Sequence, residues 1–518
     1  MSIASLVQRS LYALGSLENV GAGFQFRIQN AAADATVTRI FSMRVDATDV
    51  PLDALDLDLG EGRVLPARDV TPERPAAIAR SQSARVQVRS PQLTAGPHEI
   101  TLALEVAPFG RLELHAHDAI GAPHAHDGPA RSVPYLKDPA LDYAPDEIAA
   151  RRRYVEEHTG ARLEHTSRAS FDPAITRGNI ENFTGVAQVP LGFAGPLRVN
   201  GEHAQGDFLI PLATTEGTLV ASYGRGMKVL NLCGGATCTV EGDRMQRAPV
   251  FIFDSARDAR NFRSWVHEHI GDIRQAAEAT SHVAKLAMIE DYLASKFAYL
   301  RFDYTTGDAA GQNMVGRATL AACEWIRANA PGVRAFYLEA NLATDKKVSH
   351  INTLRTRGKR VTAEATITRQ ALAEHMRVTP EALLQLGGAG NVGAFLSGAT
   401  SNGLHAANAL TAMFIATGQD VANVTEGSTA VVYAEPTLAG DLYMSVTLPS
   451  LIVATYGGGT GLATQRECLE VLGCYGMGKV NKLAEVVAAV VLAGELSLAS
   501  AIAAVEWVSA HEKFGRNR

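Results

Sequence analysis

The sequence predicts an α+β protein in which a small antiparallel β domain precedes a larger mixed domain. Residues 1–120 contain short stretches in which apolar and polar side chains alternate, the period of a half-buried strand. From residue 141 to residue 518, helical and strand patterns follow one another instead. A chain of 518 residues is also too long for one hydrophobic core, because domains typically hold about 100–200 residues.

The N-terminal region predicts an antiparallel β-sandwich, joined to the rest by a linker at residues 121–140 that contains glycine and proline. Within it, Pro108 and Gly110 mark the turn of a β-hairpin. The alternating stretches are residues 23–29, 36–45, 84–89 and 98–116. The overall pattern resembles the small β-sandwich subunits that accompany C-glycoside-deglycosidase-type proteins.

A group of histidines lies at the end of this region. Imidazoles two residues apart on a strand project to the same face, and with nearby carboxylates they could hold a divalent metal. The sequence favours the other interpretation, a polar strand end that runs into a linker rich in histidine. The candidate metal ligands are His115, His117, His124 and His126.

Residues 249–338 predict an inserted domain of ferredoxin-like type, because strand patterns there are separated by helical patterns. Its flanks, residues 141–248 and 339–518, would form one large domain. The expected strands are residues 250–253, 299–304 and 335–338, and the expected helical segments are residues 256–273, 281–289 and 314–328.

Two glycine-rich runs follow the predicted insertion. Gly388 to Gly393 matches GxGxxG, but the preceding residues 379–386 have a helical pattern where a dinucleotide-binding fold needs a strand. We therefore expect a tight backbone turn there instead of a nucleotide site. The second run, Gly457–Gly459, is a loop whose backbone amides could approach a phosphate.

Composition narrows the function classes. A formal net charge of −6 argues against a nucleic-acid surface. The five cysteines form no CxxC pair and predict neither a disulfide framework nor a zinc site. Residues 1–30 carry no apolar segment of the kind found in a signal peptide, so we expect none. The longest apolar run, Val486–Gly494, is far shorter than the ~20 residues that span a bilayer. We expect a soluble cytoplasmic protein.

Glu216 is the first candidate for chemistry, because small and hydroxylated residues surround it and burial there would raise its pKa. The alternative is an exposed glutamate that caps a helix beginning near Thr218. If Lys346 and Asp420 meet Glu216 in one pocket, the lysine would stabilise negative charge on a carbonyl oxygen and the glutamate would donate a proton to it. His511 could protonate a leaving thiolate.

A series of motifs in residues 140–518 closely resembles the 3-hydroxy-3-methylglutaryl-CoA reductase family. The motifs occur in the order that the family has, which makes the resemblance highly specific. They are residues 181–185, 190–196, 213–217, 301–302, 307–314, 344–347, 405–408, 418–420, 441–443, 456–460 and 492–497.

This resemblance implies the four-electron reduction of an acyl-CoA thioester through a thiohemiacetal and an aldehyde, with NADPH favoured over NADH. It implies Glu216 as proton donor, Lys346 as oxyanion stabiliser, Asp420 as their coupling partner and His511 as the acid for the CoA thiolate. The binding residues implied are Arg247, Asp345, Lys347, His405 and Asn408 for the acyl group; Ser222 and Arg225 for CoA; and Asp308, Gly311, Gln312, Asn313, Met314, Gly457, Gly458 and Gly459 for the nicotinamide cofactor.

The resemblance also implies a homodimer or homotetramer with the active site at a subunit interface, and no membrane anchor. Several features depart from the family pattern. The N-terminal β domain is one that we expect the family to lack, and residues 387–402 look longer than usual. Glu339 stands where eukaryote-like members have a serine against the substrate.

Two other functions remain open on the sequence. The first is a related enzyme that acts on a different acyl-CoA, suggested by Glu339 and by the altered glycine run. The second is a non-catalytic CoA-binding scaffold that works through its β domain. The presence of Glu216, Lys346, Asp420 and His511 together argues against a scaffold, because a scaffold need not retain all four.

Overall fold

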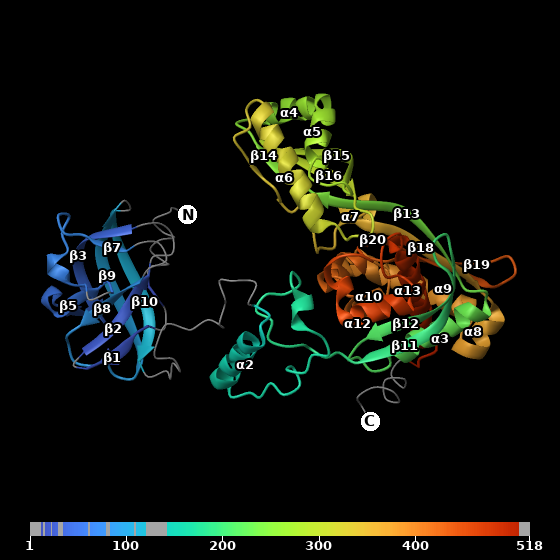
Figure 1. The fold of residues 1–518 in the computed structure, drawn as a ribbon, viewed down its shortest axis with the longest axis horizontal. Helices are drawn as coiled ribbons and strands as arrows, with labels where there is room; N and C mark the ends of the chain where they lie inside the picture. Colours follow the sequence, from blue (N-terminus) through green and yellow to red (C-terminus); the bar gives the residue numbers. More distant parts are fainter. Residues whose placement is uncertain are drawn as a thin grey trace. The chain divides into compact units, whose positions relative to one another are not determined.

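The computed structural model describes residues 12–13, 16–21, 23–29, 35–60, 63–78, 83–107, 110–120 and 142–506. The chain forms two compact units, Met1–Ser132 and Val133–Arg518 (Figure 1). The first is built of strands, and the second mixes helices and strands. This composition confirms the predicted α+β class.

Within its described residues, the N-terminal unit contains two sheets of five strands each, and all of the pairings described there are antiparallel. Their apolar faces enclose one core that includes Phe26, Val86 and Leu104, which is the arrangement of a β-sandwich. One sheet runs β1 (Glu18–Val20), β2 (Gly23–Gln29), β8 (Ser83–Val88), β5 (Leu55–Asp58) and β6 (Val64–Pro66); the other holds β10 (Gly110–Ile120), β9 (Gly96–Ala107), β3 (Ala35–Val45), β4 (Thr48–Val50) and β7 (Ala76–Ile78).

The predicted hairpin is confirmed, since β9 and β10 pair along their full length from Val106 opposite Gly110 to Gly96 opposite Ile120. His115 and His117 lie exposed on β10, and the His115 ring is 3.8 Å from the Glu113 carboxylate. His124 and His126 lie outside the described residues. Among the residues that are described, the group with metal-ligand spacing is Glu202, His203 and Glu485, so a metal at the histidines stays a prediction.

Across residues 142–506, the large unit is organised on one sheet of ten strands. Strand β13 joins its two parts: Thr237–Arg244 pairs with β18, and Met245–Arg247 pairs with β16. The strands are β11 (Leu191–Gly201), β12 (Gln205–Ala213), β13 (Ala236–Arg247), β14 (Val250–Ile252), β15 (Lys285–Ala294), β16 (Phe297–Thr305), β17 (Ala335–Tyr337), β18 (Gly358–Ile367), β19 (Val431–Pro436) and β20 (Leu442–Leu451).

Helix α13 (Val480–Ala503) lies at the centre of the main core and packs against α3, α10 and β18. By length and composition α13 could cross a membrane, and it is longer than the apolar run that the sequence indicates. Most of its residues are buried inside the fold, however, as in the core helix of a globular domain. The other helices are α2 (Pro145–Thr159), α3 (Leu219–Leu232), α4 (Ala256–Glu268), α5 (Ile270–Glu278), α6 (Gln312–Asn329), α7 (His350–Arg355), α8 (Arg369–Met376), α9 (Pro380–Ser397), α10 (Ala406–Thr417), α11 (Val424–Gly427) and α12 (Ala463–Val471).

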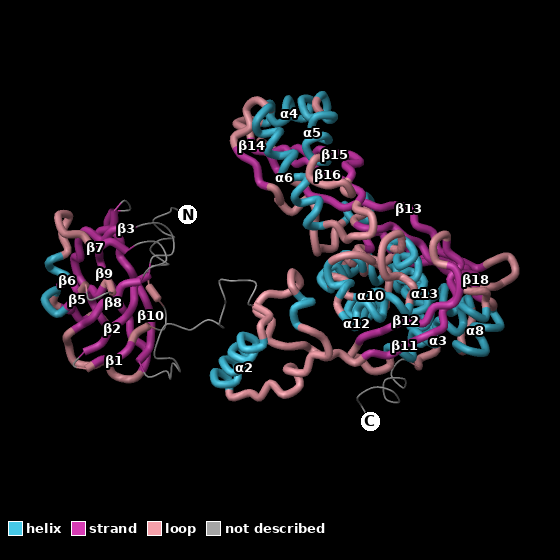
Figure 2. Tube along the Cα trace, in the orientation of Figure 1, coloured by secondary structure: helices cyan, strands magenta, loops and turns pink. Residues whose placement is uncertain are grey.

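A second hydrophobic core lies between α4, α5, α6 and the strands β14 to β17. It includes Phe251, Phe302 and Val315 and is separate from the core around α13. This core supports an inserted domain, whose boundaries stay a prediction. Between α2 and β11 the chain is mostly loop, with one short 3₁₀ turn, η3 (Pro173–Thr176) (Figure 2).

Two local predictions were wrong. The helical pattern at residues 281–289 ends in strand β15, which pairs with β16 from Lys285 opposite Thr305 to Ala294 opposite Phe297. Pairing with a neighbouring strand outweighs a local helical pattern, because strand preference depends on tertiary context.

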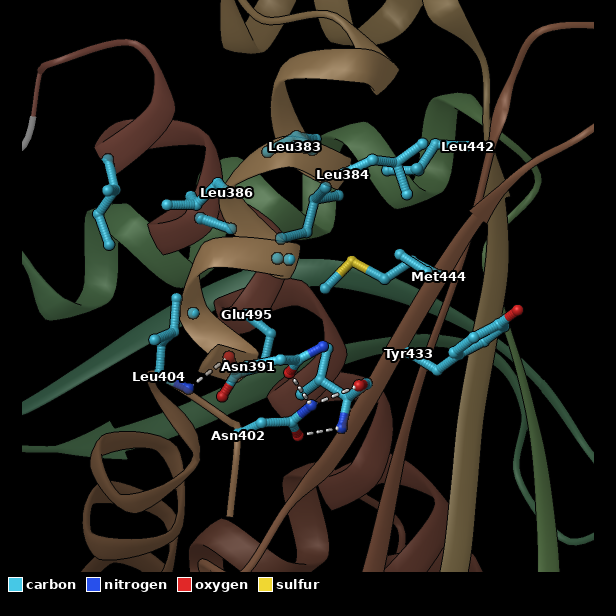
Figure 3. Close-up of a pocket in the computed structure, with 18 residues that line it drawn as sticks. Leu383, Leu384, Leu386, Asn391, Asn402, Leu404, Tyr433, Leu442, Met444 and Glu495 are labelled. Carbon is cyan, nitrogen blue, oxygen red and sulfur yellow. Dashed lines mark hydrogen bonds between the residues drawn. The ribbon is translucent and has the colours of Figure 1, made fainter. Parts of the chain in front are cut away.

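The glycine run Gly388–Gly393 is likewise part of a continuous helix, α9, and not a turn. None of its glycines has positive φ, Thr379 caps the helix through the Ala382 N–H, and Gly398 in the left-handed conformation ends it. A cavity of about 360 Å³ lies under α9, lined by apolar side chains such as Leu384 and Met444 (Figure 3).

Packing of α3 on α13 gives a test of the core. At Gly226 in α3, a Cβ atom would lie 1.9 Å from the Ala493 carbonyl oxygen of α13, so Gly226→Ala forces the helices apart. We expect a loss of about 1–3 kcal/mol in the free energy of unfolding, measured by urea titration. Gly224→Ala, on the same helix with open space at its Cβ, is the control and should be neutral or stabilising. Equal effects of the two substitutions would contradict this account of the packing.

Candidate active site

Lys346 and Asp420 form an ion pair with 2.8 Å between Nζ and Oδ2. Asp420 begins a 3₁₀ turn, η4 (Val421–Asn423), and its other oxygen accepts the N–H of Ala422 at 3.1 Å. The hydrogen bond to Asp420 raises the pKa of Lys346, so the lysine stays charged at neutral pH. The structure therefore brings two of the predicted residues together as a charged pair.

Asp345 lies next to this pair and is held by two arginines. Its carboxylate accepts from Arg357 at 2.6 Å and from Arg247 at 3.4 Å. Burial acts to raise the pKa of Asp345, but the charge and hydrogen bond of Arg357 with the charge of Arg247 bring it below its ordinary value. Arg247 also donates to the carbonyl of Gln312, which connects the predicted acyl-binding group to the predicted cofactor residues.

Glu216 meets Asn408, whose amide nitrogen donates to the carboxylate at 2.7 Å. The backbone N–H of Glu216 donates to the Thr214 hydroxyl at 3.0 Å. Helix α3 begins at Leu219, Thr218 occupies its N-terminal cap position, and no side chain makes a capping hydrogen bond there. The alternative interpretation of Glu216 as the capping side chain is therefore wrong. Glu216 is exposed in the single chain, so the burial expected for it is not found there.

His405 is buried at the start of α10 and its ring stacks on Tyr223 with centroids 4.6 Å apart. Tyr223 donates its hydroxyl hydrogen to the His405 carbonyl at 2.6 Å. Burial lowers the pKa of His405 to about 4, and its Nε2 has no hydrogen-bond partner. A neutral imidazole with one unused nitrogen can accept or donate a hydrogen bond to a ligand.

Helix α10 is held by Glu495 of α13, whose carboxylate accepts the N–H groups of Leu404, His405 and Ala406 at 2.7–3.0 Å. Figure 3 shows the bond to Leu404. Two residues further along α13, Ser497 accepts from Arg225 at 3.1 Å through its hydroxyl and at 2.6 Å through its carbonyl. The Ser497 hydroxyl is also 3.1 Å from that of Ser222. The predicted CoA residues thus lie together on α3 against α13.

A cavity of about 630 Å³ collects most of the predicted cofactor residues. Asp420 lines it too, so the carboxylate partner of Lys346 lies at its wall. A Cβ atom at Gly418 would lie 2.2 Å from the Gly459 carbonyl oxygen, so only glycine fits there. The predicted residues that line the cavity are Gly311, Gln312, Asn313, Met314, Gly457, Gly458 and Gly459.

Asp308, in contrast, is not among the residues that line this cavity. Its carboxylate accepts the N–H groups of Gly478, Lys479 and Val480 at 2.8–3.1 Å, and so ties the start of α13 to the loop before α6. This is the arrangement by which a carboxylate stabilises a helix N-terminus. A direct contact of Asp308 with the cofactor stays a prediction.

Within one chain the predicted residues form two groups at opposite ends of α10. His405 and Asn408 lie at its start with Glu216, whereas Asp420 follows its end with Lys346. A helix of 12 residues is about 18 Å long, so the groups do not touch along it. Lys347 is exposed, Glu339 accepts the N–H groups of Ala340 and Asn341, and His511 lies outside the described residues.

Sequence reasoning missed four residues that hold this site in place: Tyr223, Arg357, Glu426 and Glu495. Glu495 had a signal in the sequence, because a carboxylate inside an apolar helix must find partners. Arg357 and Glu426 had none, since their partners are far away in the sequence.

The low pKa of His405 predicts a specific loss of stability in acid. An unfolded histidine takes up its proton near pH 6.5 and the folded one only near pH 4, so acid favours the unfolded chain. Relative to His405→Gln, the wild-type protein should lose about 2 kcal/mol in free energy of unfolding between pH 7.5 and pH 5. Urea titrations of both proteins across this range measure the difference, and parallel pH dependences would contradict the assignment.

Comparison with known proteins gives a consistent result for both units. The model of the hydroxymethylglutaryl-coenzyme A reductase family matches residues 147–516, and the model of that enzyme's N-terminal domain matches residues 7–121. The second match corrects the expectation that the family lacks the β domain. It also replaces the resemblance of this domain to C-glycoside-deglycosidase subunits.

Among curated proteins, the chain is 45% identical to 3-hydroxy-3-methylglutaryl-coenzyme A reductase of Methanothermobacter thermautotrophicus over 72% of this chain and 94% of that protein. Identity to the Methanocaldococcus jannaschii reductase is 43%, over 71% and 92%. Among solved structures, the class II reductase of Streptococcus pneumoniae bound to NADPH shares the fold with a TM-score of 0.53 and 18% identity, over 68% of this chain and 92% of that one. The chain belongs to the hydroxymethylglutaryl-coenzyme A reductase family.

Proposed function

We propose that this protein reduces 3-hydroxy-3-methylglutaryl-CoA to mevalonate and CoA with two molecules of NADPH, through a thiohemiacetal and mevaldehyde. Reduction of hydroxymethylglutaryl-CoA in the mevalonate pathway is the activity of its family. The observation that carries the mechanism is the Lys346–Asp420 ion pair at the wall of the glycine-lined cavity. NADPH, when bound, supplies hydride to the carbonyl carbon.

In this mechanism the chain holds and moves protons around the acyl carbonyl. The Lys346 ammonium stabilises the oxygen as negative charge develops on it, and Asp420 keeps the lysine protonated. Glu216 donates the proton to that oxygen, and Asn408 orients its carboxyl group. His511 protonates the CoA thiolate as it leaves the thiohemiacetal.

We infer a homodimer or homotetramer in which each active site takes residues from two copies. The reason is that Glu216 and Lys346 lie at opposite ends of α10, so the two residues of one chain cannot both reach the same carbonyl group. Exposure of both side chains in the single chain leaves them accessible to a second copy. Burial by that copy would supply the raised pKa that a proton donor needs at neutral pH.

The binding groups divide in the same way. His405 and Asn408, with Arg225 and Ser222 nearby on α3, would hold the acyl group and CoA at one end of α10. Arg247, Asp345 and Lys347 would complete the acyl site from the other copy.

The cofactor fits the cavity at the other end of α10. A Cβ atom at Gly457 or Gly458 would meet no other atom within 4 Å, so the backbone of this loop is open to a ligand. The N-terminus of α6, at Gln312, lines the same cavity. The solved Streptococcus pneumoniae reductase, of the same fold, is a complex with NADPH. A cytoplasmic location stays a prediction.

The first experiment follows NADPH oxidation by absorbance with hydroxymethylglutaryl-CoA, alongside NADH and other acyl-CoAs. We expect turnover with hydroxymethylglutaryl-CoA and NADPH. Turnover with a different thioester alone would show a related enzyme, in which Glu339 is the first residue to test. CoA binding without any turnover would show a scaffold.

Lys346→Ala removes the charge that stabilises the oxyanion, which should lower kcat on the order of 10³-fold for both the thioester and free mevaldehyde. Stopped-flow or steady-state NADPH oxidation with each substrate measures the loss. Lys285→Ala, which removes an exposed ion-paired lysine of β15, is the control and should leave both rates unchanged. A variant at Lys346 that retained mevaldehyde reduction would contradict the role.

His511→Gln should separate the two reductions. Its loss slows thiolate departure, so turnover of the thioester should fall by about 10²-fold or more, whereas reduction of free mevaldehyde should change little. Parallel assays with the two substrates measure this split. Equal losses with both substrates would refute the role of His511.

A further inference from the structure

Glu426 is a buried carboxylate beside the proposed oxyanion site that the mechanism above does not use. Its side chain is 1% exposed, on the short helix α11. One oxygen, Oε1, accepts the backbone N–H of Lys346 at 3.1 Å and lies 3.5 Å from Nε of Arg357. The other oxygen has no hydrogen-bond partner. A buried carboxylate without full hydrogen bonding is costly to keep, which calls for a role.

The Lys346 loop needs such support, because its backbone is in an unfavourable conformation. Thr344 and Lys346 both have a φ of 55°, in the left-handed region that residues with a Cβ seldom occupy. Each such residue costs on the order of 1 kcal/mol and persists only when its surroundings hold it. The N–H bond to Glu426 fixes the peptide that precedes the Lys346 side chain.

The short segment from Asp420 to Glu426 therefore contacts Lys346 at two points. Asp420 at the start of this segment binds the ammonium group, and Glu426 six residues later binds the backbone N–H of the same residue. The 3₁₀ turn η4 and helix α11 connect the two carboxylates directly. The spacing of the two carboxylates thus fixes both the backbone N–H and the ammonium group of Lys346.

Glu426 also begins a chain of alternating charges that leads to the cofactor cavity. Its neighbour Arg357 is fully buried and donates to Asp345, which in turn binds Arg247. Arg247 donates to the carbonyl of Gln312, the first residue of α6 and part of the cavity lining. Displacing one carboxylate in this series of charges would alter the partners of the neighbouring arginine.

We propose that Glu426 is a positioning residue, which acts through the backbone of Lys346 and through Arg357 to aim the lysine ammonium at the reacting oxygen. The inference rests on the proposed role of Lys346. It adds to the predicted site a residue that contacts neither substrate nor cofactor.

The charges that face Lys346 come from three elements. Asp420 precedes η4, Asp345 is in the same loop, and Glu426 is on α11; each raises the pKa of Lys346. The charges that face Glu426 are Arg357 and Asp345. Glu426→Gln keeps an acceptor for the Lys346 N–H but removes one negative charge, so it should lower the pKa of Lys346. Glu426→Ala removes the acceptor as well.

The test measures turnover and the pKa of the Lys346 ammonium group in separate experiments. We expect kcat to fall about 10-fold in Glu426→Gln and about 100-fold in Glu426→Ala, while KM for NADPH changes less than threefold. Competitive labelling of Lys346 with an amine reagent across pH gives its pKa without any need for turnover. That pKa should fall in Glu426→Gln.

Glu485→Gln is the matched control. Glu485 is an equally buried carboxylate, bound to the N–H groups of Glu202, His203 and Ala204, far from the proposed site in its contacts. Glu485→Gln should lower Tm but leave kcat and the pKa of Lys346 unchanged. An unchanged kcat and Lys346 pKa in Glu426→Gln would overturn the inference, as would equal effects in Glu485→Gln. Absence of turnover in the wild-type protein would instead count against the proposed function, and the labelling result would still decide the role of Glu426.

Discussion

Two carboxylates buried inside the apolar helix α13 determine how the rest of the large unit is arranged. Glu485 accepts three N–H groups at the turn between β11 and β12, and Glu495 accepts three at the start of α10. Burial raises the pKa of Glu495, and its three N–H bonds oppose that rise. Because a buried carboxylate is tolerated only with such partners, α10 and the β11–β12 turn can take only one position on α13.

The fixed position of α10 then decides where chemistry can occur. Its start carries His405 and Asn408 with Glu216, and its end leads into Asp420 with Lys346. The helix therefore keeps the two halves of the proposed site about 18 Å apart in one chain. A rigid separation of this kind favours a site completed by a second copy over one completed by closure of a loop, because closure would have to break the Glu495 contacts.

Much of the fold could be predicted from local patterns. Alternation in residues 98–116 predicted the β9–β10 hairpin, and buried and exposed residues do alternate along β10, whereas residues 100–104 of β9 are all buried. The same reasoning failed for β15, whose pairing with β16 is a tertiary effect, and for the glycines of α9, which have helical φ despite their freedom. Motifs located Glu216, Lys346 and Asp420, but spacing along the chain could not show that α10 separates Glu216 from the Lys346–Asp420 pair.

Three of the four residues that sequence reasoning missed share one physical property. Arg357, Glu426 and Glu495 are buried charges whose partners are backbone N–H groups or other buried charges distant in sequence. A buried charge is costly when any of its partners is removed, so each one makes the geometry around it unusually specific. At Lys346 this specificity holds a strained backbone in place, and at His405 it keeps a neutral imidazole against Tyr223. The precision of the site therefore comes from groups that do not react. The motif at residues 492–497 contains Glu495 without indicating its partners, and Arg357 and Glu426 lie outside all of the motifs.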